Sequence, residues 1–198
     1  NNMKTGAGNL YGIRGLYFAV NIHDNQVYSN KVTSGLASSA SIVMGINSST
    51  NAQTSENIYN NLIYDLVIEG PFTTTNNQVY GMNLAIPATA NRSVYNNVVR
   101  DLAVNLPSGS GTVNAIRAGD GNVSNIYKNQ MYNLTASGAA GQAIGIYTSG
   151  TVQGNVYNNF ISDLRAPASA NASAVNGIQV ASGTRAGLFY NTLYLNAS

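Results

Sequence analysis

The sequence contains no cysteine, and charged residues make up only 8% of its 198 residues. The absence of cysteine excludes a disulfide framework, thiolate metal sites and a cysteine nucleophile. The nine lysines and arginines are scattered singly, and without a basic stripe we expect no nucleic-acid partner. No apolar run approaches the roughly 18 residues that a membrane span needs, so we expect no membrane span in this sequence.

Asparagine is the most unusual part of the composition, with about 30 residues, far above ordinary usage. Asparagine is unfavourable in helices and common in turns, because its amide competes for backbone hydrogen bonds. The low charge does not indicate disorder, since disordered segments combine high net charge with few aromatic and β-branched residues. This chain has a net charge of +2 and 13 tyrosines, and we expect it to fold.

A four-residue motif, apolar-tyrosine-polar-polar, recurs six times at intervals of 30 to 36 residues. Such a period is typical of a repeat architecture, in which one small unit stacks on the next. The six copies are Val27-Tyr28-Ser29-Asn30, Ile58-Tyr59-Asn60-Asn61, Val94-Tyr95-Asn96-Asn97, Ile126-Tyr127-Lys128-Asn129, Val156-Tyr157-Asn158-Asn159 and Phe189-Tyr190-Asn191-Thr192.

Two further motifs recur in phase with the first. A small residue precedes an isoleucine or methionine at Gly12-Ile13, Gly45-Ile46, Gly81-Met82, Ala115-Ile116, Gly145-Ile146 and Gly177-Ile178. A polar residue precedes a leucine at Asp65-Leu66, Asp101-Leu102, Asn133-Leu134 and Asp163-Leu164. Three short apolar-polar segments per period, separated by turn-forming residues, predict three strands per repeat.

The three-strand repeat favours a β-helix over other repeat folds. Apolar residues alternate at period two and never keep helical spacing over the roughly ten residues that a helix needs. Leucine-rich repeats need denser leucines at a shorter period, and propeller blades have four strands and a longer period. We therefore predict an all-β fold: a right-handed parallel β-helix, or solenoid, of about six coils with three short strands per coil, forming a single domain over residues 1–198.

Stacked coils place equivalent residues in columns about 4.8 Å apart. We expect two apolar columns in the core, Ile13, Ile46, Met82, Ile116, Ile146 and Ile178 in one, and Val27, Ile58, Val94, Ile126 and Val156 in the other. A third column should form a buried hydrogen-bonded ladder at a turn, because the amide of asparagine both donates and accepts. Its predicted members are Asn30, Asn61, Asn97, Asn129 and Asn159, closed by Thr192.

The pattern I/V-Y-N-N-x-I-x-D-L, alternating with G-I, resembles the right-handed β-helix proteins of the pectin-lyase-like superfamily. In particular, it is similar to the large secreted or surface proteins of Bacteroidota that the type IX system exports. The resemblance covers essentially the whole chain and implies an extracellular or cell-surface location in a bacterium. The resemblance also implies that an enzymatic function must be considered. Lyases of this superfamily hold calcium with clustered aspartates and use an Arg or Lys base, and its hydrolases group aspartates with a histidine.

Carboxylates suited to such chemistry are scarce in this sequence. Asp65 and Asp101 occupy equivalent positions on adjacent coils, about 5 Å apart, near the separation of a retaining glycosidase pair. Asn133 and Asp163 fill the same position in later coils, which indicates a property of the repeat. A turn-capping role, in which the side-chain oxygen accepts backbone N–H bonds, is the favoured interpretation, with a catalytic pair as the alternative.

Two other places bring a carboxylate near a base. His23 and Asp24 are adjacent, but neighbours on a strand point to opposite faces, so we expect a solvated pair and no dyad. Arg117 and Asp120 flank a glycine-rich turn with too few oxygens for calcium, which takes about six to eight. We therefore predict no catalytic residue, no metal site and no cofactor.

Two outward-facing columns are the candidate functional surfaces. One is an exposed aromatic ladder, whose rings either shield the sheet or offer a platform for sugar rings or another protein: Tyr28, Tyr59, Tyr95, Tyr127, Tyr157 and Tyr190. The other column follows the Gly-Ile motif, and it is polar and varied from coil to coil, as a ligand-binding face would be. Its members are Arg14, Asn47, Asn83, Arg117, Tyr147 and Gln179.

These features predict a non-catalytic scaffold outside the cytoplasm: a structural, adhesive or carbohydrate-contacting part of a larger secreted protein, with a polysaccharide or another surface protein as its partner. A polysaccharide lyase or glycoside hydrolase with a site on the Gly-Ile strand face is the alternative. Asn1-Asn2-Met3 resembles the Asn-Asn-apolar segment that follows the ladder tyrosines, so we expect the chain to start inside a coil. We therefore expect a fragment of a longer repeat protein, with further domains of the same polypeptide on both sides.

Overall fold

The computed structural model describes residues 2–3, 8–16, 19–33, 40–49, 52–71, 76–107 and 109–195. Their regular structure consists of nineteen β-strands, β1 to β19. No helix long and apolar enough to cross a membrane occurs within these ranges. The strands form three parallel sheets, named here sheets A, B and C.

Each sheet collects every third strand of the chain. Sheet A contains β1 (Asn2–Met3), β4 (Gln26–Thr33), β7 (Leu62–Glu69), β10 (Val98–Asn105), β13 (Gln130–Ala136), β16 (Phe160–Arg165) and β19 (Thr192–Tyr194). Sheet B contains β2 (Gly8–Gly15), β5 (Ser41–Ser49), β8 (Asn77–Ala85), β11 (Gly111–Gly119), β14 (Gln142–Ser149) and β17 (Val175–Val180). Sheet C contains β3 (Ala19–His23), β6 (Ser55–Tyr59), β9 (Asn91–Tyr95), β12 (Val123–Tyr127), β15 (Thr151–Tyr157) and β18 (Gly183–Phe189).

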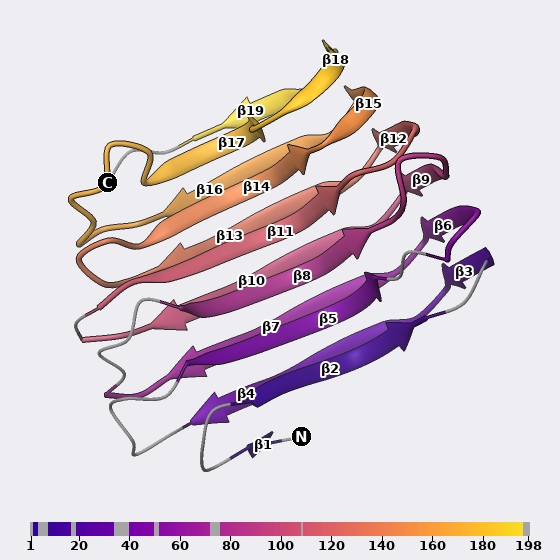
Figure 1. The fold of residues 1–198 in the computed structure, drawn as a ribbon. Helices are drawn as coiled ribbons and strands as arrows, with labels where there is room; N and C mark the ends of the chain where they lie inside the picture. Colours follow the sequence, from indigo (N-terminus) through magenta and orange to yellow (C-terminus); the bar gives the residue numbers. More distant parts are fainter. Residues whose placement is uncertain are drawn as a thin grey trace.

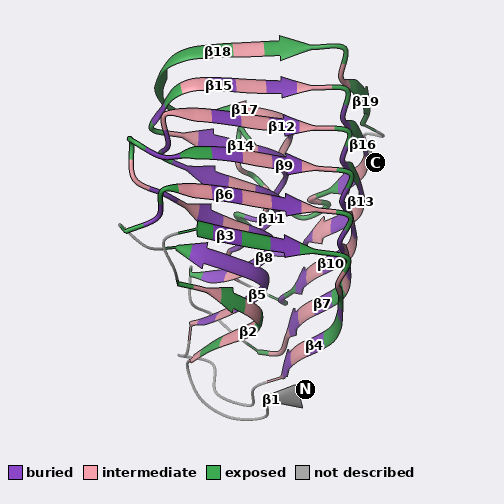
Figure 2. Cartoon of the chain, turned by 90° about the vertical axis from the view of Figure 1, so that its right-hand side faces the viewer, coloured by how far each residue is buried: buried purple, intermediate pink, exposed green. Residues whose placement is uncertain are grey.

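The chain visits the sheets in the fixed order B, C, A, and successive coils stack along one axis (Figure 1). After β1, the described strands make six sets of three, and equivalent strands of neighbouring coils pair in parallel. In Figure 2 the strands of sheet C run from left to right across the front while the coils rise from the N-terminus, so the solenoid is right-handed. The predicted right-handed parallel β-helix with three strands per coil is confirmed.

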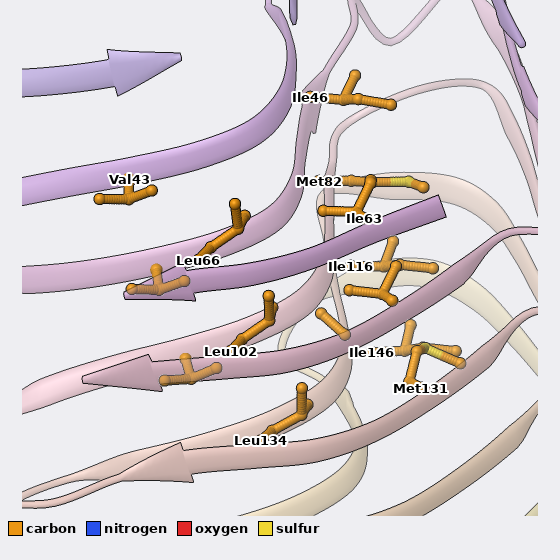
Figure 3. Packing of buried hydrophobic residues seen from close by; sticks show 14 of the residues in the cluster. Val43, Ile46, Ile63, Leu66, Met82, Leu102, Ile116, Met131, Leu134 and Ile146 are labelled. Carbon is orange, nitrogen blue, oxygen red and sulfur yellow. The ribbon is translucent and has the colours of Figure 1, made fainter. Parts of the chain in front are cut away.

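Apolar side chains fill the interior as columns along the solenoid axis (Figure 3). The column of sheet B is in the predicted register, and Ile46, Met82 and Ile116 have no exposed surface. Ile13 and Ile178, in the first and sixth coils, are partly buried and pack against this core. The predicted first core column is therefore confirmed.

The small residue before each member of that column is required by close packing. A Cβ atom on Gly45 would lie 2.6 Å from the carbonyl oxygen of Gly81 and 2.6 Å from a methyl group of Ile63. A Cβ on Gly81 would lie 2.4 Å from Val99. These distances are too short for a side chain unless its neighbours move, which explains the glycine half of the Gly-Ile motif.

The second predicted core column is correct in the later coils and wrong in the first. Ile58 is in register with Val94 on sheet C, and the residue below Ile58 is Ile22. Val27 lies on sheet A opposite Ile63, where it is still buried. The first copy of the tetrapeptide is therefore Ile22-His23-Asp24-Asn25. Both segments have an apolar residue, then a ring, then asparagine two positions later. Only the number of residues per coil shows which of the two belongs to the column.

The asparagine ladder lies at the corner between sheets C and A. Asn97 Oδ1 accepts from both the backbone N and the Nδ2 of Asn61, at 3.0 Å each. Asn97 Nδ2 in turn donates to Asn129 Oδ1 at 2.9 Å and to the carbonyl oxygen of Ile58 at 2.9 Å. The repeated pattern joins Asn25, Asn61, Asn97, Asn129, Asn159 and Asn191.

Two predicted members of the ladder are wrong. Asn30 is buried in sheet A opposite Leu66, and Thr192 lies opposite Phe160. Their places are taken by Asn25, five residues before Asn30, and by Asn191, one residue before Thr192.

Candidate functional site

The polar column after the Gly-Ile motif lies on the outer face of sheet B. Its predicted members are in register from coil to coil: Arg14, Asn47, Asn83, Arg117, Tyr147 and Gln179. Asn83 Nδ2 donates to Asn47 Oδ1 at 2.8 Å, and Arg117 Nη1 donates to Asn83 Oδ1 at 3.0 Å. The guanidinium of Arg117 also lies 5.7 Å from the ring centroid of Tyr147, within cation–π range. The middle of this column is a bonded polar strip.

A row of buried side chains runs beside the polar strip on the same outer face. Met44, Tyr80 and Ile144 are at most 7% exposed, yet they lie outside the core cluster. Burial raises the pKa of Tyr80, an effect that Arg117 opposes and Tyr147 reinforces. This row of side chains is therefore largely shielded from solvent, although it lies on the outer face of sheet B.

Two acceptor atoms of this face lack hydrogen-bond partners among the described residues. They are Oδ1 of Asn114, a 3%-exposed residue in register with Tyr80, and Oε1 of Gln179. Buried polar atoms without a partner are rare in native proteins. These oxygens can accept hydrogen bonds from the hydroxyl or N–H groups of a bound molecule.

Five rings stack along the outer face of sheet C: His23, Tyr59, Tyr95, Tyr127 and Tyr157. Their centroids are 4.7 to 5.0 Å apart, and their planes differ by 0° to 9°. Desolvation raises the pKa of Tyr127, and Tyr157 and then Tyr95 add to that shift. Because stacked rings turn their faces to one another, they present mainly edges and hydroxyl groups to solvent. That geometry favours shielding over a continuous platform for sugar rings.

Two predicted members do not belong to this stack. Tyr28 lies on sheet A, where it stacks on Tyr64 with centroids 5.0 Å apart. Tyr190 follows β18 with a left-handed backbone (φ 53°) and is 87% exposed. His23 occupies the first position of the column, and Phe189 is the residue in register with Tyr157.

Asp65 and Asp101 lie inside strands of sheet A, where both have left-handed backbones (φ 55° and 54°). Aspartate and asparagine tolerate this conformation better than most residues, which explains their repetition here. Asp65 Oδ2 accepts from Ser29 Oγ at 2.8 Å, and Asp101 Oδ1 accepts from Asn133 Nδ2 at 2.5 Å. The carboxylates are thus held by side chains, Asp101 also by the guanidinium of Arg100, which differs from the predicted backbone capping.

His23 and Asp24 form a hydrogen-bonded pair at the surface. His23 Nδ1 lies 2.7 Å from Asp24 Oδ2, and both side chains are well exposed, 44% and 63%. Hydrogen bonds from His23 and then from Asn60 lower the pKa of the Asp24 carboxyl. The pair is exposed to solvent as predicted, but the prediction that the two side chains point to opposite faces is wrong, because Asp24 has a left-handed backbone (φ 56°) and its carboxylate meets His23.

Glu56 and Arg92 form an internal ion pair that the sequence reading missed. They are in register on sheet C, each two residues before a core residue of the Ile58 column. Strand alternation therefore places both side chains inside. The same two-residue spacing, from Glu56 to Ile58 and from Arg92 to Val94, could have predicted this pair from the sequence.

No group of three or more His, Cys, Asp or Glu side chains that could hold a metal ion occurs in the described ranges. Comparison with known proteins adds no relative: no protein-family model, no curated protein and no solved structure matches the chain. The sheet topology defines the class as a parallel β-solenoid.

Proposed function

We propose that this chain is a non-catalytic extracellular or cell-surface scaffold, forming a structural or adhesive part of a larger secreted protein that contacts carbohydrate. The observation that carries the proposal is the self-pairing of its polar columns. Asn61 binds Asn97 at the corner, Asn83 binds Asn47 on sheet B, and ring stacks on ring along sheet C. Such columns join coil to coil, whereas catalysis needs groups of different chemistry converging in a cleft.

The proposal includes membership of the pectin-lyase-like superfamily and export by the type IX system of a bacterium. The recurring I/V-Y-N-N and G-I motifs support that membership, together with the parallel solenoid in which they lie at equivalent positions of successive coils.

The polar strip of sheet B is the proposed contact for an extended polysaccharide. Arg117 supplies hydrogen-bond donors, Tyr147 supplies an aromatic surface, and the oxygens of Asn114 and Gln179 can accept from hydroxyl groups. A strip built on stacked strands repeats about every 4.8 Å, which suits a ligand that also repeats along its length.

Incubation with neutral and uronic-acid polysaccharides, followed by assays for new reducing ends and unsaturated products, tests the scaffold proposal. We expect no turnover with any of them. Robust turnover would overturn the proposal and favour a lyase or glycoside hydrolase instead; loss of that turnover in Arg117→Ala would place its site on sheet B.

A further inference from the structure

The aromatic stack of sheet C stops at Tyr157, although an aromatic residue follows it in register. Phe189 pairs with Tyr157 across β15 and β18, but among the described rings Tyr157 stacks only on Tyr127. A Cβ atom on Gly187 would lie 2.5 and 2.6 Å from the Cε2 and Cζ atoms of Phe189. The Phe189 ring therefore leans along its own strand and covers Gly187.

Gly187 makes this arrangement possible, because it interrupts a polar column next to the rings. The residues in register with it are Asn21, Asn57, Ser93, Asn125 and Asn155. Within that column Asn155 Nδ2 donates to Asn125 Oδ1 at 2.9 Å. Where the side chain is missing, Phe189 fills the space, and the face of Tyr157 that points toward β18 loses its stacking partner.

A hollow of about 400 Å³ results at this break, lined by Asn125, Asn155, Tyr157, Asn158, Phe189 and Tyr190. Its size lies within the range of roughly 300–1,000 Å³ that is typical of ligand sites. Three lining residues are aromatic, three are asparagines, and none is charged. Tyr59, Tyr95 and Tyr127 are covered by rings on both faces, whereas His23 and Tyr157, at the two ends of the stack, are each covered on one face.

We propose that this hollow binds one ring of a neutral sugar. The C–H face of a pyranose can pack on the uncovered face of Tyr157, and aromatic surface supplies most of the buried apolar contact in such sites. The hydroxyl groups around the ring need partners that both donate and accept, which is what the amides of Asn155 and Asn158 offer. A uronic acid would find no cation among the lining residues, and an amino sugar would find no anion.

This inference rests on the carbohydrate-contacting part of the proposed function, and it names a place and a ligand class different from the strip on sheet B. Titration calorimetry of the full chain with manno-, cello- and chito-oligosaccharides tests it, with oligogalacturonate as the charged comparison. We expect at least one neutral oligosaccharide to bind, and oligogalacturonate not to bind at this hollow.

Two variants remove the site in different ways. Tyr157→Ala removes the aromatic face and should weaken binding about tenfold, the upper value for one aromatic stacking contact. Gly187→Asn restores the polar column and forces the Phe189 ring away from it, onto Tyr157, so it should close the hollow and weaken binding to a similar extent. Tyr95→Ala is the matched control, because that ring has a partner on both faces and its loss leaves the hollow intact.

The proposal is overturned if no neutral oligosaccharide binds, if only oligogalacturonate binds, or if binding is as tight in Tyr157→Ala and Gly187→Asn as in the parent chain. Thermal melts of each variant show that the comparison is made on folded protein. Absence of binding would leave the non-catalytic scaffold standing, whereas only polysaccharide turnover would contradict the scaffold, so the two failures are distinguishable.

Discussion

Arg92 and Glu56 form an ion pair inside the solenoid, with Arg92 Nε 2.5 Å from Glu56 Oε2 and no exposed surface on either side chain. Arg92 also donates from Nη2 to the carbonyl oxygen of Gly119 at 3.2 Å. Transferring both charges from water costs several kcal/mol per ion, and their attraction offsets that cost only while both partners are present. The pair is therefore a place where single and double substitutions should behave differently.

Glu56→Met alone should lower the free energy of unfolding by about 3–5 kcal/mol, because it leaves Arg92 charged and unpaired in the core. The double variant Glu56→Met/Arg92→Met should lie within about 1 kcal/mol of the parent or be more stable. Urea denaturation measures both. The exposed pair Lys31–Glu69 is the control, and its replacement should cost at most about 1 kcal/mol. A single variant as stable as the double one would contradict this interpretation.

Asn97→Leu should lower the free energy of unfolding by about 1–3 kcal/mol, because the backbone N–H of Asn61 and the carbonyl of Ile58 lose their partner. Asn25→Leu is the matched control at the first position of the ladder, where the side chain is only partly buried, and it should cost less. Thermal or urea unfolding measures the loss of stability in both variants. Equal losses in the two variants would show that the inner part of the ladder is not special.

Gly81→Ala should destabilise the chain by about 1–3 kcal/mol, since the new methyl group would meet Val99 at 2.4 Å and the carbonyl oxygen of Ala115 at 2.5 Å. Gly119→Ala, in a neighbouring strand of the same sheet, places its methyl 3.7 Å or more from other atoms and should cost clearly less. If the two melting temperatures fall by the same amount, close packing does not explain the glycines of the Gly-Ile motif.

Stability should decrease in alkaline solution because of Tyr80 and Tyr127. Their pKa values are raised in the folded chain, so the unfolded chain loses these protons first, near the ordinary value of 10.0. The stability that depends on them is complete below about pH 10 and is lost as pH rises through the folded-state pKa values. Urea titrations from about pH 8 to pH 11 should show a shallower decline for Tyr80→Phe than for the parent. Identical declines would contradict the assignment to Tyr80.

The sequence was sufficient to predict the solenoid, its three strands per coil and the columns of its central coils. Each column has one physical requirement: a small residue at the position of Gly45, an apolar side chain at Ile46, and an amide at Asn61. Periodicity of this kind survives variation in loop length, because insertions fall between the strands.

The ends of the columns could not be read from local sequence alone. Val27-Tyr28-Ser29-Asn30 fits the motif as well as Ile22-His23-Asp24-Asn25 does, and its tyrosine matches the other copies better than a histidine. Hydrogen bonds along the ladder span 36, 36, 32, 30 and 32 residues, and the first interval is met only from Asn25. The break at Gly187 could not be predicted for the same reason. Tyr190 matches the tyrosine of the motif, yet Phe189 is the residue in register with Tyr157.

Native-state hydrogen exchange at the ladder tests most directly whether these columns bind the coils into one scaffold. The backbone N–H groups of Asn61, Asn97, Asn129 and Asn159 each donate to the side chain of the next coil, at 3.0 to 3.1 Å. If the ladder ties the coils together, all four should exchange only through global unfolding, with a common free energy equal to that from urea denaturation. Exchange of these groups through local opening, at a free energy well below the global value, would contradict the scaffold.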